Sequence, residues 1–235
     1  QQDADVICLQ DLRALESELD ADIFHPAGYF AYFFDSGTQH YNGVAIYTRH
    51  QPKALIFGLG FNSGIDMEGR YLQIDFERYS VGSLLAPAAL HENESIEDKI
   101  NFFEDLQALM HKITRKRRHF IFCGNWAMAH SRKDVQNWQK YVADSGFLPH
   151  EQQWFDQIYK EIGYCDAFRL VNSDSDEFSW WPSGTQNVGD GWRTDLHIIS
   201  EALKTKVEYA TIYKSQSFSS HQPVIIDYDI DPEEL

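Results

Sequence analysis

The order of segments along the chain predicts a mixed α/β fold, in the form of a four-layer α/β sandwich. The 235 residues are enough for one sizeable core, and apolar residues make up 43% of them. Short apolar or alternating runs typical of strands recur along the whole chain, and segments with helical periodicity lie among them. Two strand-rich halves, each with helices, are therefore expected to form a single domain over residues 1–235.

The first half consists mainly of strand-like runs, which favours an antiparallel sheet. Residues 3–11 read as the end of a helix followed directly by a strand, so a preceding strand and most of a first helix are expected to be missing from the chain. A short helix is expected over residues 12–19. Further strands are expected within residues 24–34, 41–49, 52–59, 70–76 and 79–85.

The second half contains the most regular predicted helix. Ser95 and Asp98 have the spacing of a capping box, and apolar residues from Ile100 to Ile113 then recur at helical spacing. Two more helices are expected over residues 134–141 and 150–162. The strands of this half are expected over residues 120–123, 193–199, 207–212 and 224–229.

The charge balance excludes a protein that grips nucleic acid over its whole surface. With 36 acidic and 20 basic residues, the formal charge of −16 opposes a polyanion that approaches at random. Seven basic or histidine side chains nevertheless fall within the nine positions from His111 to His119. This basic run is suited to contact phosphates or an acidic partner. The alternative is a solvated helix end whose cations match the helix dipole.

The cysteines and the hydropathy indicate a soluble, cytoplasmic protein with no membrane segment. No apolar run approaches 18 residues, and no secretory signal opens the chain. The three cysteines, Cys8, Cys123 and Cys165, are odd in number and far apart, which is typical of buried, reduced thiols. Their spacing does not match a metal site.

A set of stretches along the chain carries a resemblance when it is taken together: residues 5–10, 41–45, 147–149, 178–180, 192–195 and 218–223, with Trp154. In this order the stretches resemble the exonuclease III and abasic-site endonuclease family. The resemblance covers nearly the whole chain and implies the four-layer sandwich of that family. It also implies a site for phosphodiester hydrolysis, which needs a metal ion, a base for water and a group that stabilises the developing charge.

At most of the positions that the resemblance makes catalytic, the sequence carries a different residue. Asp11 stands in place of a metal-binding glutamate, and Leu85 in place of a tyrosine. Asn125 replaces the aspartate that activates water, and Ala127 replaces its companion asparagine. An amide takes no proton at pH 7, and an alanine side chain forms no hydrogen bond. Ser220 replaces the carboxylate of a Ser-Asp-His sequence.

Two of these positions, Asp195 and His221, keep the family residue, and the resemblance implies that they hydrogen-bond to one another. A general base alone contributes about 10²–10⁴-fold to a rate. Asp11 with Asp195 would supply too few oxygen donors for an octahedral Mg²⁺. We therefore expect an inactive relic with no catalytic residue, metal or cofactor. The alternative is a metal-dependent phosphodiesterase or abasic-site endonuclease that uses Asp11, Asp195 and His221 in a rearranged site.

A second set of stretches narrows the resemblance: residues 9–14, 47–54, 58–61, 69–73 and 223–229, and the basic run before Cys123 and Gly124. Through these stretches the chain resembles most closely, within this superfamily, the catabolite repression control proteins. The resemblance implies a translational repressor without nuclease activity that acts with the RNA chaperone Hfq on A-rich sites of catabolic mRNAs. It also implies weak or no RNA binding by the protein alone, and self-association is a further alternative.

The expected contacts to RNA phosphates or to the partner are cationic. Lys116, Arg117 and Arg118 belong to the basic run, and Arg132 follows the former catalytic loop. Trp126 and Trp181 are expected to pack in or around the core, with stacking on a ligand as the alternative. A purely structural scaffold without RNA contact is a third possibility, and its assembly would depend little on salt.

Overall fold

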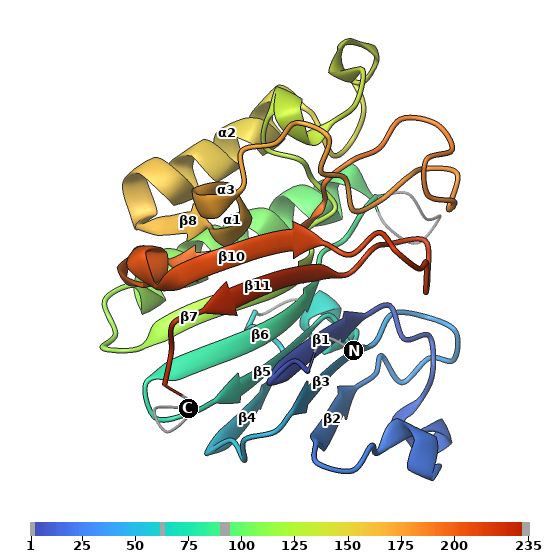
Figure 1. The fold of residues 1–235 in the computed structure, drawn as a ribbon, viewed down its shortest axis with the longest axis vertical. Helices are drawn as coiled ribbons and strands as arrows, with labels where there is room; N and C mark the ends of the chain where they lie inside the picture. Colours follow the sequence, from blue (N-terminus) through green and yellow to red (C-terminus); the bar gives the residue numbers. More distant parts are fainter. Residues whose placement is uncertain (1–2, 62–63, 90–94, 232–235) are drawn as a thin grey trace. The chain divides into compact units, whose positions relative to one another are not determined.

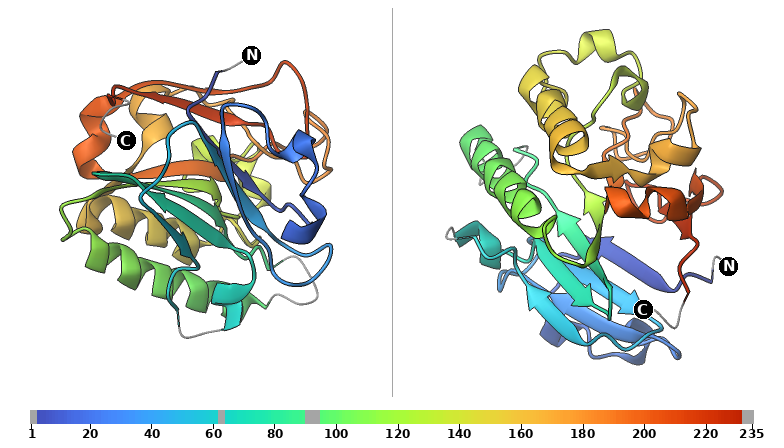
Figure 2. Two further views of the ribbon diagram at one scale, coloured as in Figure 1. Left: turned by 90° about the horizontal axis from the view of Figure 1, so that it is seen from below. Right: turned by 90° about the vertical axis from the view of Figure 1, so that its left-hand side faces the viewer.

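The computed structural model describes residues 3–61, 64–89 and 95–231, and the chain divides into two compact units. Unit 1 comprises residues 1–85, 116–124 and 230–235, and unit 2 comprises residues 86–115 and 125–229. The chain therefore passes from one unit to the other more than once. Figures 1 and 2 show the elements of each unit in sequence colours. A single domain over residues 1–235 stays a prediction.

Unit 1 contains an antiparallel sheet in the order β1-β3-β2. Its strands are β1 (Val6–Gln10), β2 (Phe30–Phe34) and β3 (Val44–Thr48). In the central strand β3, Ala45 and Ile46 are fully buried, and Ala45 packs with Leu19 and Phe33 in one apolar cluster. The predicted strands of this region are confirmed.

The other strands of unit 1 are neighbours in the order β4-β5-β6-β7. They are β4 (Ala54–Phe57), β5 (Tyr71–Asp75), β6 (Tyr79–Leu85) and β7 (His119–Asn125). The pairs β4–β5 and β5–β6 are antiparallel, as predicted. Every residue of β6 is buried. A side chain at Gly124 would lie 1.9 Å from the carbonyl oxygen of Leu84, so the residue before Asn125 must be glycine.

The helices belong to unit 2. They are α1 (Ile96–Ile113), α2 (Pro149–Gln157) and α3 (Ala167–Val171), and a π-helical turn over Ile158–Ile162 continues α2. The predicted capping box is present, because the Ser95 hydroxyl accepts the Asp98 N–H at 3.0 Å and the Asp98 carboxylate accepts the Ser95 N–H at 3.2 Å. Helices α1 and α2 lie side by side (Figure 2, right). Between them, the Trp154 indole donates to the Phe103 carbonyl at 2.8 Å.

Two antiparallel strand pairs complete unit 2. One pair is β8 (Tyr164–Asp166) with β9 (Asp195–Ser200), and the other is β10 (Val207–Ile212) with β11 (Val224–Tyr228). Helix α3 packs on the second pair through Phe168, which contacts Ala210 and Ile212 in one buried cluster. The strands expected in the last third of the chain are thus confirmed.

Two predicted helices are wrong. Over residues 12–19 the structure has only a 3₁₀ turn, Glu16–Glu18, because Arg13 is left-handed (φ 54°) and the Asp35 carboxylate takes the Glu16 N–H at 2.7 Å. Residues 134–141 contain no α-helix. Two 3₁₀ turns, Arg132–Asp134 and Trp138–Lys140, lie here instead, separated by the left-handed Asn137 (φ 50°).

Cys8, Cys123 and Cys165 form no disulfide within the described part of the chain, and the expectation that all three are buried is only partly met. Cys123 is buried, whereas Cys8 and Cys165 are half-buried. A hydrogen bond with Cys8, together with burial, raises the pKa of the Cys123 thiol well above its ordinary value. Among the described residues, no helix is long and apolar enough to cross a membrane.

Candidate functional site

Strand β7 ends at Asn125, and the turn that follows is held by local hydrogen bonds. The Asn125 side-chain oxygen accepts the backbone N–H of Ala127 at 2.9 Å, and its own carbonyl accepts the Ala86 N–H at 2.9 Å. Ala127 has a left-handed backbone (φ 52°), so this short bridge supports an unfavourable conformation. The Asn125 amide therefore has a clear structural role, which requires an acceptor but no proton transfer.

A buried ion pair fixes the same turn from the side of α1. The Lys99 ammonium donates to the Ala127 carbonyl at 3.1 Å and lies 2.6 Å from a carboxylate oxygen of Glu151. The side chains of Lys99 and Glu151 are only 3% and 5% exposed. Glu151 also accepts the Gly146 N–H at 2.7 Å. This pair was not predicted, because its partners lie 52 positions apart and each one belongs to an ordinary amphipathic helix.

Trp126, which stands between Asn125 and Ala127, is part of the core. Its indole is completely buried and donates to the Leu196 carbonyl at 3.2 Å, while its backbone N–H reaches the Thr194 carbonyl at 2.9 Å. Trp181 is 2% exposed. The expectation of core packing is confirmed for both tryptophans, and neither offers a surface for stacking.

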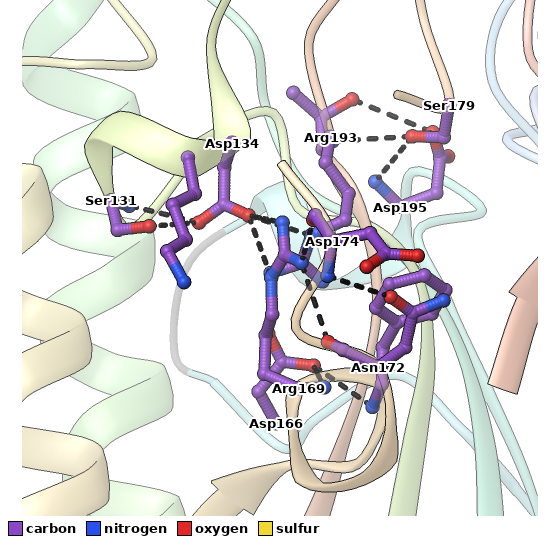
Figure 3. Close-up of polar contacts among 12 residues, drawn as sticks. Ser131, Asp134, Asp166, Arg169, Asn172, Asp174, Ser179, Arg193 and Asp195 are labelled. Atoms are coloured by element: carbon purple, nitrogen blue, oxygen red, sulfur yellow. Dashed lines mark hydrogen bonds and ion pairs between the residues drawn. The ribbon is translucent and has the colours of Figure 1, made fainter. Parts of the chain in front are cut away.

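The two retained residues, Asp195 and His221, are in contact as the resemblance implied. His221 Nδ1 lies 2.8 Å from Asp195 Oδ2, and the Ser179 hydroxyl donates to the same oxygen at 2.6 Å (Figure 3 shows the Ser179 contact). The Ser179 oxygen in turn accepts the N–H groups of Thr194 and Asp195 at 3.3 and 3.2 Å. Trp180 stacks on the His221 ring, with centroids 6.0 Å apart. Asp195 is thus one member of a closely hydrogen-bonded group.

Ser220 is exposed. The hydroxyl next to it, that of Ser219, donates to the His221 carbonyl at 2.9 Å and accepts the His221 N–H at 3.0 Å. The backbone around His221 is therefore held by Ser219.

A buried network of four charges supports the segment that leads into β9 (Figure 3). Arg193 donates to Asp134 at 2.8 Å and to Asp166 at 2.6 Å, and Arg169 donates to Asp134 at 2.7 Å. Arg193 and Asp134 are each 1% exposed. Burial alone would raise the pKa of Asp134, but the charges of Arg193 and Arg169 outweigh burial and hold that pKa far below its ordinary value. Sequence reasoning missed this network because nothing in the spacing of its members relates them.

Two of the positions that the resemblance makes catalytic, Asp11 and Leu85, lie in unit 1 and form hydrogen bonds there. Both carboxylate oxygens of Asp11 accept from the Arg13 guanidinium, at 3.0 Å each from Nε. The Leu85 N–H donates to the Arg70 carbonyl at 2.8 Å. In neither unit does the described part of the chain contain a group of three or more His, Cys, Asp or Glu side chains that could hold a metal ion.

The four cations expected to contact a partner do not share one environment. Lys116 and Arg117 are exposed, whereas Arg118 donates to the carbonyls of Phe76 and Tyr79 at 2.8 and 3.1 Å and so braces the β5–β6 turn. These three lie in unit 1, and Arg132 lies in unit 2. Helix α1 ends at Ile113, so most of the basic run follows the helix and does not cap it.

Comparison with known proteins places this site in a family. The model of the endonuclease/exonuclease/phosphatase family matches residues 1–213. The chain is 30% identical over 227 residues to an exodeoxyribonuclease of Bacillus subtilis, a match that covers 95% of this chain and 88% of the relative.

Solved structures confirm the fold. An AP endonuclease from Archaeoglobus fulgidus superposes with a TM-score of 0.84 at 20% identity and covers 96% of this chain and 89% of its own. A 3'-5' exonuclease from Neisseria meningitidis superposes with a TM-score of 0.83 at 20% identity, with coverages of 96% and 90%. The predicted fold class, a mixed α/β sandwich with several sheets, is the fold of these neighbours. The chain belongs to the endonuclease/exonuclease/phosphatase family.

Proposed function

We propose that this chain is a catalytically inactive member of its family that, together with the RNA chaperone Hfq, represses translation of catabolic mRNAs at A-rich sites. The observation that carries the proposal is the end of β7. Asn125 stands where the resemblance implies the aspartate that activates water, and its amide accepts the Ala127 N–H at 2.9 Å. An amide cannot take the proton of an attacking water at pH 7.

The surviving acidic groups support the same proposal. Asp195 accepts hydrogen bonds from Ser179 and faces His221, and Asp11 is bound by Arg13. Each carboxylate thus has a local partner that accounts for its presence. The family's nuclease names describe the relatives, and we propose that this chain has kept their fold and lost their chemistry.

The charge distribution supports a regulator that needs a partner in order to hold RNA. The formal charge of −16 opposes RNA binding by the chain alone, whereas Lys116 and Arg117 are exposed cations on a short segment. A chaperone that presents the RNA would bring phosphates to such a segment without requiring a basic surface elsewhere.

A gel-shift experiment tests the proposal. Purified full-length protein is mixed with an A-rich RNA with and without Hfq. We expect no shift by the protein alone, a shift by Hfq, and a slower ternary band when both proteins are present. Tight binding of the RNA by this chain alone, or the absence of any ternary band, would contradict the proposal.

Charge reversal at Arg117 tests whether the basic run contacts the RNA or the chaperone. Arg117→Glu should weaken the ternary band, because Arg117 is exposed. Glu208→Gln in β10 changes one exposed charge in unit 2 and serves as the control. If Arg117→Glu leaves the ternary band unchanged, the basic run is a solvated segment and carries no contact. Arg118 is unsuited to this test, because it braces the β5–β6 turn.

A further inference from the structure

The exposed surface of unit 2 carries a stacked pair of planar groups that the proposed function does not yet use. The guanidinium carbon of Arg132 lies 4.2 Å from the centroid of the Trp138 ring. Arg132 is exposed and Trp138 is half-buried, with the indole packed against a buried apolar cluster that includes Val135 and Trp192. The indole is therefore anchored in the apolar cluster, and the guanidinium that covers it belongs to an exposed side chain.

The two turns that carry this pair are held firmly. Asp190 accepts hydrogen bonds from Asn137 at 2.6 Å, from Lys140 at 3.0 Å and from Tyr141 at 2.9 Å, so it ties down the turn that contains Trp138. The Gln136 N–H also reaches the Gly191 carbonyl at 2.8 Å. The position of Trp138 is consequently set before any ligand arrives.

The turn that contains Arg132 is anchored by its own third residue. The Asp134 carboxylate accepts the Ser131 N–H at 3.0 Å and its hydroxyl at 2.7 Å, and it is gripped by Arg193 and Arg169 from inside the unit. Among the described residues, the structure gives Arg132 no carboxylate partner. A cation without an ion pair, on a fixed turn, is available to an anionic ligand.

We infer that Arg132 and Trp138 form a stacking platform for a base of single-stranded RNA. The inference rests on the proposed function and adds a direct contact between this chain and the RNA. A nucleic-acid base stacks on an aromatic ring or on the plane of a guanidinium, and unpaired bases are the ones accessible to such contacts. Adenine has a large π-face, so an A-rich strand suits the platform. Lys133, the exposed neighbour of Arg132, donates to the Ser173 carbonyl at 3.4 Å and adds a second positive charge beside the platform.

The platform differs in chemistry from the basic run of unit 1. A point charge such as an ammonium satisfies a phosphate, whereas stacking requires a flat group. The decisive variant is therefore Arg132→Lys, which keeps the charge and removes the plane. Trp138→Phe keeps an aromatic face, and Trp138→Ala removes it.

The test uses full-length protein, Hfq and an A-rich RNA that carries 2-aminopurine at one adenine position at a time. Stacking quenches the fluorescence of 2-aminopurine. In the wild-type assembly we expect quenching at one or more positions beyond that caused by Hfq alone. Arg132→Lys and Trp138→Ala should each remove this added quenching and raise the Kd of the ternary assembly by about 5-fold to 10-fold. Trp138→Phe should retain most of both signals.

Lys206→Ala is the control, because it removes a cation that pairs with Asp229 on the surface of the same unit. It should change neither signal. If the Arg132 and Trp138 variants weaken assembly while the quenching persists, the pair contacts the chaperone, and the inference is overturned. Unchanged affinity and quenching in Arg132→Lys and Trp138→Ala would also overturn it. Failure of the wild-type chain to assemble at all would instead reject the proposed function on which the inference rests.

Discussion

Two neighbouring parts of unit 2, the residues at the end of β7 and those at the start of β9, are held by hydrogen bonds of different kinds. At the end of β7, Asn125 and Ala127 differ from what the family resemblance implies, yet the turn is intact because an amide oxygen caps it. At the start of β9, Asp195 keeps its carboxylate and contacts both Ser179 and His221. The comparison teaches that the turn after β7 needs only a hydrogen-bond acceptor at position 125, whereas the carboxylate of Asp195 serves two neighbours at once.

The largest effect is expected from the ion network that supports the segment before β9. Asp134→Ala would leave Arg193 and Arg169 without a shared carboxylate in a buried place. Removing one partner of such a buried network costs about 3–5 kcal/mol, so urea unfolding should show a loss of stability of that order. Asp229→Ala, which breaks an exposed pair with Lys206, is the control and should cost less than about 1 kcal/mol. Similar midpoints for the two variants would show that the network does not support β9.

The second prediction concerns Asp195 itself. Asp195→Ala leaves the Ser179 hydroxyl and the His221 ring without their shared acceptor, so we expect a loss of about 1–3 kcal/mol in urea unfolding. At temperatures where the variant is folded, its assembly with Hfq and RNA should match that of the wild type. A variant that keeps full stability but loses assembly would assign Asp195 to binding. It would contradict the structural role that the comparison gives to Asp195.

The third prediction is a pH dependence that arises on the same strand. Burial lowers the pKa of His197 to about 4, from an ordinary value near 6.5. Because the unfolded chain then binds a proton that the folded chain excludes, stability should fall as the pH drops from about 6.5 toward 4. Linkage gives a loss of about 2 kcal/mol at pH 5.

The contribution of His197 can be isolated by substitution. In His197→Gln, the fall in stability between pH 7 and pH 5 should be smaller by about 2 kcal/mol than in the wild type. His111→Gln, at an exposed position of α1, is the control and should leave the pH profile unchanged. If His197→Gln and the wild type lose equal stability over this range, the titration of His197 does not contribute.

The smallest effect on stability is expected from a substitution at Asn125. Asn125→Asp puts back a carboxylate whose oxygen can accept the same Ala127 N–H, so the free energy of unfolding should change by no more than about 0.5 kcal/mol. It should also yield no measurable cleavage of DNA, because Ala127 and Ser220 still lack the groups that the resemblance implies. Cleavage by Asn125→Asp would show that a single residue separates this chain from an active enzyme.

Much of the fold could be predicted because its signals are local. Apolar alternation identified the strand of Val44–Thr48, and Ser95 with Asp98 identified the start of α1. The wrong helix over residues 134–141 has a tertiary cause, since Asp134 is taken up by Arg193 and Asn137 adopts a left-handed backbone. Local sequence carries no information about a carboxylate's distant partner.

Part of the candidate site could be predicted from the sequence, and part of it could not. The contact between Asp195 and His221 followed from the family resemblance, and the structure places these atoms 2.8 Å apart. The ion pair of Lys99 with Glu151 and the stacking of Arg132 on Trp138 did not follow, because each depends on how two turns or helices pack. Arg118 was grouped with Lys116 and Arg117 by sequence, yet only the structure shows that it braces a turn.

One measurement tests the central claim, that this chain keeps a nuclease fold without nuclease chemistry. Full-length protein and Hfq are assembled on A-rich RNA, and a duplex with one abasic site is added to the same tubes with Mg²⁺ or Mn²⁺. The AP endonuclease from Archaeoglobus fulgidus serves as the reference. We predict a ternary assembly with intact RNA and no cleavage of the duplex above background. Metal-dependent cleavage of the duplex that is abolished by His221→Ala would contradict the claim and establish a rearranged active site.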